Sequence, residues 1–198
     1  MAKLVLKTAP AVTPIVLADV KAHLRWDDAD GSETYDSDAQ LTQLISDAIA
    51  IAEEETWSRF ITQTWTQYFD AFTDPLCLSN PPVASISSVK YQDAANAEQT
   101  LAATVYELGQ ENGIGVVRRK YNQDWPITLD HPDSVVVEFI CGYGLAVSVP
   151  DAINQALKMI VAYLSSHRGD DDKNILITAA LPRTIQSLLS PHSFRTVA

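Results

Sequence analysis

The order of hydrophobic patterns along the chain limits its fold more than any other feature. Helical periodicity comes first, a long stretch of strand-like character follows, and helical periodicity then returns. In residues 38–55, apolar residues recur at spacings of three and four, as on one buried face of a helix (Leu41, Leu44, Ile45, Ala48 and Ala52). Residues 149–170 repeat this spacing (Ile153, Ala156, Leu157, Ile160, Val161 and Leu164). Two long helices therefore bracket everything between them.

Both long helices carry start signals, and the second also carries a stop signal. Ser37 or Asp38 can accept hydrogen bonds from the free N–H groups of a first helical turn. Pro150 and Asp151 suit the start of the second helix, and Gly169 suits its end. Shorter helices are predicted at residues 17–25 and 181–191, where apolar residues again have helical spacing.

The middle of the chain has the composition of strands. Residues 61–72 are rich in Thr, Trp, Tyr and Phe, and residues 85–93 alternate between apolar and polar. Asn112–Gly113 predicts a tight turn, and residues 93–99 predict another. The near-continuous apolar run at residues 134–144 is the strongest strand signal and indicates a central position in a sheet.

These patterns predict an α+β fold, in which a helical base of two long helices and short terminal helices carries an inserted antiparallel β-rich lobe. The length of 198 residues fits a single domain of this kind. Its expected parts are an extended N-terminal arm (1–16), the helical base (17–57 and 150–191), the β-rich insert (61–144) and a C-terminal tail (192–198).

Composition excludes several classes of protein. With 14 basic and 25 acidic residues, the net charge of -11 makes the chain a poor candidate for gripping DNA phosphates. The acidic surface either provides solubility or lines a passage through which DNA slides, and composition does not separate the two. No apolar run approaches the roughly 20 residues that span a membrane, and the N-terminus does not read as a signal peptide. Cys77 and Cys141 have apolar neighbours, which predicts small buried core residues without a disulfide.

The sequence shows no catalytic or cofactor motif. The histidines have no metal-binding spacing, and the serines lack the glycine-flanked nucleophile turn. Asp28, Asp30 and Gly31 match part of a calcium loop, but Trp26 and Ser37 stand where that loop needs carboxylates. We therefore expect no enzyme activity, no cofactor and no metal.

Six segments in order resemble the head–tail connector (head completion or adaptor) family of long-tailed double-stranded-DNA bacteriophages. Each is weak alone, but their joint order is specific. They are LADVKAHLRWDD, AEEETWSRFITQTW, PPVASISSVKYQD, VEFICGYG, VPDAINQALKMIVAYLSSHR and LPRTIQSLLSPH. The long acidic loop DGSETYDSD and the apolar segment ILITAALP depart from the pattern of the family.

The resemblance implies a non-enzymatic ring, usually twelvefold, beneath the portal protein in the neck of a virion. Such a ring assembles in the host cytoplasm, extends the DNA channel without sequence-specific binding, and offers a platform for the next tail-side protein. Two alternatives remain open. One is a tail terminator or other tail-side ring adaptor, and the other is a small metal-dependent hydrolase with an unrecognised site.

Two sets of residues are candidates for the contacts of such a ring. Arginines and aromatics are common interface anchors, which favours a portal contact through Arg183, Phe194 and Arg195. Alternatively, Arg183 caps a helix and the tail is loose. Acidic side chains are candidates for the channel wall or for an ordinary solvated face (Glu53, Glu54, Glu55, Asp170, Asp171 and Asp172). The chain ends, residues 1–16 and 181–198, are candidates for segments that order on docking.

Overall fold

The structure is a computed structural model that describes residues 3–25, 37–166 and 181–194. It confirms the α+β class, because the described residues form four α-helices and two antiparallel sheets. The chain divides into two compact units, which are described separately. Residues 1–12 and 58–145 form the β unit, and residues 13–57 and 146–198 form the helical unit.

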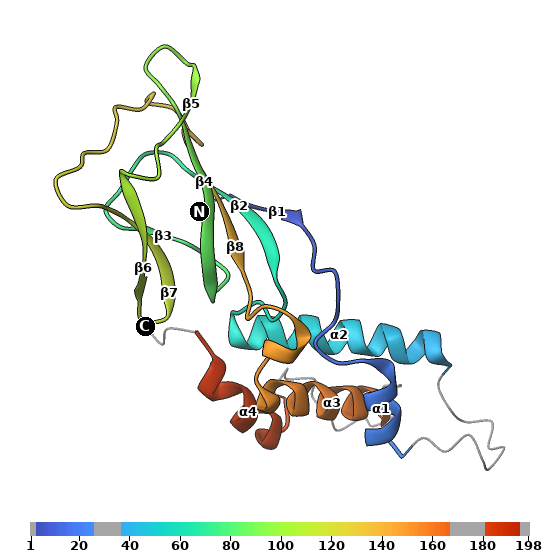
Figure 1. Cartoon of the computed structure of the whole chain (residues 1–198). Coiled ribbons are helices and arrows are strands. Elements are labelled where there is room, and N and C mark those ends of the chain that lie inside the picture. Colours follow the sequence, from blue (N-terminus) through green and yellow to red (C-terminus); the bar gives the residue numbers. More distant parts are fainter. Residues whose placement is uncertain (1–2, 26–36, 167–180, 195–198) are drawn as a thin grey trace, which may run out of the picture. The chain divides into compact units, whose positions relative to one another are not determined.

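The larger sheet of the β unit has five antiparallel strands in the order β1-β2-β8-β4-β5 (Figure 1). Its strands are β1 (Leu4–Thr8), β2 (Gln63–Phe69), β4 (Val83–Gln92), β5 (Glu98–Thr100) and β8 (Val135–Cys141). The predicted central position of the apolar run at 134–144 is confirmed, since β8 lies between β2 and β4. Residues 1–16 were expected to be an arm, but Leu4–Thr8 within them is a strand paired with β2.

The smaller sheet has three antiparallel strands in the order β3-β7-β6. They are β3 (Leu76–Cys77), β6 (Tyr106–Glu111) and β7 (Ile114–Arg119). The turn predicted at Asn112–Gly113 is confirmed and joins β6 to β7, with φ of 53° and 81° at these two residues. Positive φ at both central residues is what a two-residue hairpin turn requires, and Asn and Gly tolerate it best.

The core of the β unit is built on one face of β8. Val135, Val137, Phe139 and Cys141 alternate along this strand and are fully buried. They pack with Leu76, Val89 and Val117 and with other apolar residues of both sheets. Full burial of each large apolar side chain contributes about 1.5–3 kcal/mol, so this cluster is the main stabilising feature of the unit.

Two local expectations in the β unit were wrong. Cys77 is exposed, because it lies in the two-residue strand β3 while its neighbour Leu76 occupies the core. The turn predicted at 93–99 is shorter, because Glu98 and Gln99 already pair with β4. The first outcome depends on the pairing of β3 with the distant β7, and the second on how far the hairpin of β4 and β5 continues toward its turn.

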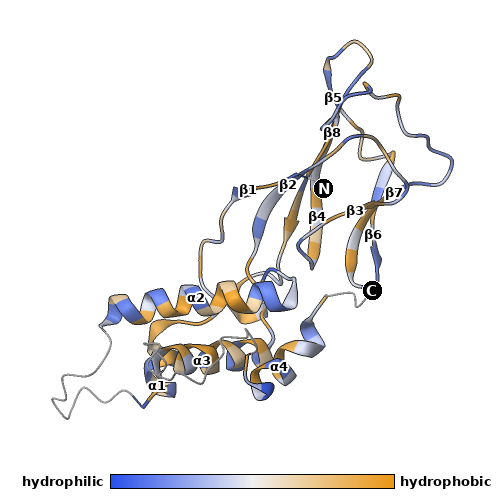
Figure 2. Cartoon of the chain, turned by 180° about the vertical axis from the view of Figure 1, so that it is seen from behind, coloured by the Kyte–Doolittle hydropathy of each residue, from blue (hydrophilic) through white to orange (hydrophobic). Residues whose placement is uncertain are grey.

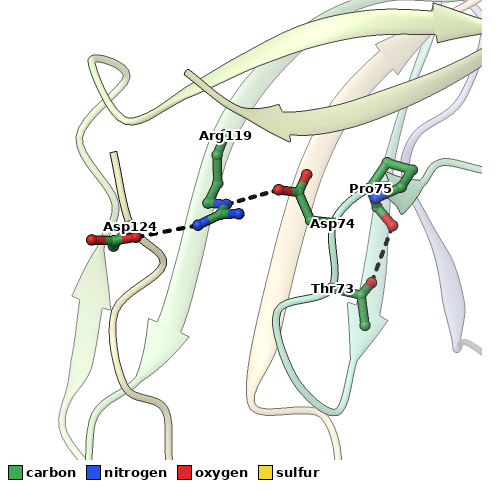
Figure 3. Close-up of polar contacts among 5 residues, drawn as sticks. All are labelled: Thr73, Asp74, Pro75, Arg119 and Asp124. Atoms are coloured by element: carbon green, nitrogen blue, oxygen red, sulfur yellow. Dashed lines mark hydrogen bonds and ion pairs between the residues drawn. The ribbon is translucent and has the colours of Figure 1, made fainter. Parts of the chain in front are cut away.

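Arg119, the last residue of β7, links two loops of the β unit (Figure 3). Its Nε donates to Asp74 Oδ2 at 2.7 Å, and its Nη1 donates to Asp124 Oδ1 at 3.2 Å. The hydrogen bond to Asp74 raises the pKa of the guanidinium above its usual value. Such exposed pairs add little stability, and the two contacts join both loops to the end of β7.

The helical unit contains α1 (Leu17–His23), α2 (Asp38–Thr56), α3 (Asp151–Ser166) and α4 (Arg183–Leu189), with short 3-10 turns η1 (Ala146–Ser148) and η2 (Ser190–His192). The predicted start of α2 is confirmed as a reciprocal cap. The N–H of Gln40 donates to Ser37 Oγ at 3.3 Å, and the N–H of Ser37 donates to Gln40 Oε1 at 2.7 Å.

The two long helices pack together with α4 and bury most of the predicted stripes, although Leu44 and Leu164 are only half-buried. Hydrophobic and hydrophilic stretches alternate along α2 in Figure 2, as expected for a helix with one buried face. At the start of α3, the carbonyl of Pro150 accepts from the N–H groups of Ile153 at 2.9 Å and Asn154 at 3.2 Å. Gly169, the predicted stop, lies outside the described residues. None of the described helices combines the length and the apolar character that crossing a membrane demands.

Candidate functional site

The C-terminal end of α2 is where the structure gathers several of the candidate residues. The last carbonyl groups of a helix lack partners within the helix. Trp57 adopts the left-handed conformation with φ of 52°, and its N–H bonds to the carbonyls of Glu53 and Glu54. The N–H of Phe194 donates to the carbonyl of Thr56 at 2.9 Å. The C-terminal segment of the chain is therefore held at the end of α2.

This end of α2 is electrostatically unusual. Glu53 and Glu55 are partly buried and Glu54 is exposed, and no basic residue lies in the last turn. Negative charge at a helix C-terminus opposes the helix dipole, at a cost of about 0.3–1 kcal/mol for each carboxylate. A left-handed tryptophan adds backbone strain of roughly 1–2 kcal/mol, because glycine is the residue that fits this conformation without penalty.

We call this group of residues the α2-end site (Glu53, Glu54, Glu55, Trp57 and Phe194). Sequence analysis assigned Phe194 and the glutamates to different surfaces, whereas the structure brings them to one helix end. No pattern of neighbouring residues predicts this arrangement, because the hydrogen bond joins Thr56 to Phe194, a residue far along the chain. Sequence analysis also missed Trp57, which is 57% exposed beside the acidic turn.

Arg183 lies elsewhere in the helical unit. It is the exposed first residue of α4, whereas Phe194 follows η2 at the other end of this C-terminal segment. Helix N-termini need acceptor groups, and a guanidinium can only donate. Positive charge at this position also opposes the dipole. The alternative in which Arg183 caps the helix therefore does not fit its position.

The other predicted site residues lie outside the described residues. These are Arg195, Asp170, Asp171 and Asp172, together with most of the partial calcium loop. Within residues 3–25, 37–166 and 181–194, no group of three His, Cys, Asp or Glu side chains could hold a metal ion. His131 is engaged locally, with Nδ1 at 2.8 Å from the carbonyl of Pro132. At the end of α2, the described part of the helical unit has acidic side chains beside an exposed tryptophan.

Comparison with known proteins identifies related folds. No protein-family model matches the chain, and no curated protein matches it in sequence. The solved structures that contain similar chains include three of gene transfer agent (GTA) particles or their necks. A chain in the virion of a native GTA particle is 25% identical with a TM-score of 0.77, and the match covers 98% of this chain and 97% of that one.

Two structures of GTA necks also contain chains with a similar fold. In the neck of an empty GTA particle computed with C6 symmetry, a chain is 22% identical with a TM-score of 0.78, and the match covers 99% of this chain and 97% of that chain. In the neck of a native GTA particle computed with C12 symmetry, the values are 23% identity, a TM-score of 0.75 and the same two coverages, 99% and 97%. The protein thus shares its fold, over almost its whole length, with chains from the structures of GTA particles and their necks.

Proposed function

We propose that this protein is a structural subunit of the neck of a phage-like particle, and specifically a head–tail connector. The observation that carries the proposal is the near-complete coverage of both chains in the match to the GTA virion. Because the match leaves almost nothing of either chain unaligned, the two chains correspond as whole subunits. The order of motifs that resembles phage connectors supports the same assignment independently of the fold.

The subunit would act as part of a ring, the twelvefold ring that the resemblance implies. Two of the similar chains come from neck structures computed with C6 and C12 symmetry, which is consistent with copies arranged around an axis. A closed ring needs two unlike surfaces on each copy that meet head to tail. The ring would extend the DNA channel below the portal and offer its other side to the next tail-side protein. Its role is mechanical, without catalysis.

The portal contact is assigned to the C-terminal segment, through Arg183, Phe194 and Arg195. Anchorage of the Phe194 N–H on Thr56 supports this, because the last residues then extend from a fixed point. Removing residues 194–198 should abolish binding to portal-bearing heads, whereas removing only residues 196–198 should preserve most of it. Full binding by the longer deletion would contradict the assignment.

The channel wall is assigned to acidic side chains, either Glu53, Glu54 and Glu55 at the end of α2 or Asp170, Asp171 and Asp172. Carboxylates repel DNA phosphates, so they let DNA slide past without adhesion. Replacing the three glutamates with lysine should slow release of DNA from filled heads. The matched control is Glu107→Lys on the exposed part of β6 in the β unit. Equal release rates for wild type and the triple variant would remove the glutamates from the channel.

The function itself is tested by sedimentation. Purified protein is mixed with portal-bearing, tail-less heads, and the heads are pelleted. The connector proposal predicts that the protein pellets with these heads and not with heads that lack a portal. Protein that stays in the supernatant contradicts the proposal, and protein that binds only isolated tails favours the tail-terminator alternative.

A further inference from the structure

We propose that the outer edge of β1 is a contact between neighbouring copies of this chain, in which an extended segment of one copy adds to the five-stranded sheet of the next. This inference rests on the proposed function, since a ring requires contacts between copies. It also specifies which surface makes one of them. The argument comes from the backbone, the side chains and the charges of β1 in turn.

The backbone of β1 has unused hydrogen-bonding groups. Among the strands that the structure describes, β1 pairs only with β2. The N–H of Tyr68 in β2 donates to the carbonyl of Lys3 at 2.9 Å, so Lys3 and Val5 direct their backbone groups toward β2. Directions alternate along an antiparallel strand. Leu4 and Leu6 therefore direct their N–H and carbonyl groups to the open edge.

The side chains of β1 are apolar at this edge. Val5 and Leu6 lie on opposite faces of the strand, and each is 42% exposed. Leu6 lies opposite Trp65 of β2, and Trp65 lies opposite Phe139 at the centre of the core. Leu6 thus continues the row of side chains formed by Phe139 and Trp65 to the edge of the sheet, where an added strand would cover it. Pairing of this kind takes its affinity from main-chain bonds and its selectivity from side-chain contacts.

Lys3, which precedes β1, and Lys7, which lies within it, do not protect the edge of the strand. Proteins commonly guard an open strand with lysine, proline or a bulge. Here Lys7 Nζ lies 2.6 Å from Glu138 Oε2 on β8, one strand beyond β2. Lys3 Nζ lies 3.5 Å from Asp133 Oδ2 and 4.6 Å from the ring centre of Tyr68. Both ammonium groups are therefore held over the sheet and away from its rim.

The opposite edge of the same sheet is protected against the addition of a strand. The outermost strand there is the three-residue β5, which covers one end of β4. The rest of β4 shows register shifts between Val83 and Ser85 and between Ile86 and Ser88. In β1 the register shifts only between Leu6 and Thr8, at the end of the strand. The two edges therefore differ, and the edge of β1 is the one suited to accept a strand.

The occupant is a second copy, because the proposed ring brings copies of this chain together. A chain of net charge -11 repels its own copies, so contacts between them are favoured where carboxylates are absent or neutralised. The two carboxylates beside β1, Glu138 and Asp133, are each paired with a lysine. The first acidic residue of the sequence is Asp19, and β1 and the exposed Val12 precede it. Pairing of β1 with β1 would be two-fold symmetric and would stop at a dimer. In a ring, β1 must instead meet a different segment of its neighbour.

Substitution of Leu6 tests the inference. Leu6→Pro removes an outward N–H without removing a bond to β2, whereas Leu6→Thr keeps that N–H and removes the apolar side chain. We expect Leu6→Pro to reduce the number of copies bound per portal-bearing head at least tenfold, and Leu6→Thr to have a smaller effect. Thermal unfolding of both variants checks that they fold. Wild-type binding by a folded Leu6→Pro variant would overturn the inference and leave the proposed function standing.

Hydrogen exchange of the wild-type protein gives a test that does not depend on any variant. Resolved to single amides, the free protein should exchange Leu4 and Leu6 quickly and Val5 slowly. In the head-bound form, Leu4 and Leu6 should slow by about tenfold or more while Val5 changes little. Unchanged rates at Leu4 and Leu6 in bound protein would overturn the β1 contact alone. Failure of the wild-type protein to bind heads or a second copy would overturn both proposals.

Discussion

The helical unit and the β unit build their cores from different kinds of residue. In the helical unit the buried positions recur within single helices, and small residues such as Ala48, Ala52 and Ala156 let the helices approach closely. In the β unit the core joins strands that are far apart in sequence, and large side chains such as Phe139 fill it. Every glycine among the described residues belongs to the β unit.

This difference shows where each unit is vulnerable. The helical unit depends on signals that act over a few residues, such as caps and apolar spacing. The β unit depends on a few positions where strands or turns meet at close range. The helical unit also carries most of the acidic residues, although Lys and Arg are shared equally between the units. Under the proposed function, the strength of contacts with DNA or a portal would therefore depend mainly on the charges of the helical unit.

The largest effect should come from Phe139→Ala. Phe139 is fully buried at the centre of the larger sheet, and truncating such a side chain costs about 3–5 kcal/mol in the free energy of unfolding. Urea unfolding should be followed by fluorescence, to which Trp65 and Trp125 of the β unit contribute, and by helical circular dichroism. If the units have separate cores, the fluorescence transition should shift to lower urea concentration by more than the circular dichroism transition does. Equal displacement of both transitions would show one cooperative unit.

Gly142→Ala should also damage the β unit. Gly142 has φ of 106°, and a Cβ there would overlap the carbonyl group of Ile61. We expect a loss of roughly 2 kcal/mol or more, because strain and steric overlap act together. The control is Gly109→Ala, whose Cβ would lie 3.3 Å from Val116 Cγ2. Similar thermal stabilities for the two variants would show that the backbone at Gly142 is not constrained.

The helical unit should respond to loss of its cap. Ser37→Ala removes one half of the reciprocal cap of α2 and should lower the free energy of unfolding by about 1 kcal/mol. Ser46→Ala is the control within the same helix, because the Ser46 hydroxyl bonds only back to the Thr42 carbonyl, at 3.2 Å. Chemical denaturation distinguishes the two. Equal stability of both variants would argue that α2 is held by packing alone.

The smallest effect concerns alkaline pH. Burial raises the pKa of Tyr106 above its ordinary value of 10.0, because the charged tyrosinate is disfavoured inside the β unit. The folded state then holds the proton more tightly than the unfolded state. Stability is fully present below pH 10 and declines as the pH rises through the raised pKa. Tyr106→Phe should lessen this decline, and an unchanged pH profile would assign the decline to other groups.

The sequence predicted the helical unit better than the β unit, and the reason is physical. The start of α2 at Ser37 and the start of α3 at Pro150 follow from side chains within one turn, so they are visible locally. The exposure of Cys77 and the pairing of β1 with β2 depend on distant partners and are not. The same limit applies to the α2-end site, where the N–H of Phe194 bonds to Thr56, directly after the glutamates. The resemblance to connectors indicated a function, but no local pattern indicated this contact.

The most direct test of the account is cryo-electron microscopy of portal-bearing, tail-less heads incubated with the purified protein. The account predicts a ring of copies on the portal axis, into which both the β unit and the helical unit fit, with a continuous channel through its centre. Heads whose portal vertex is identical with and without the protein would contradict it.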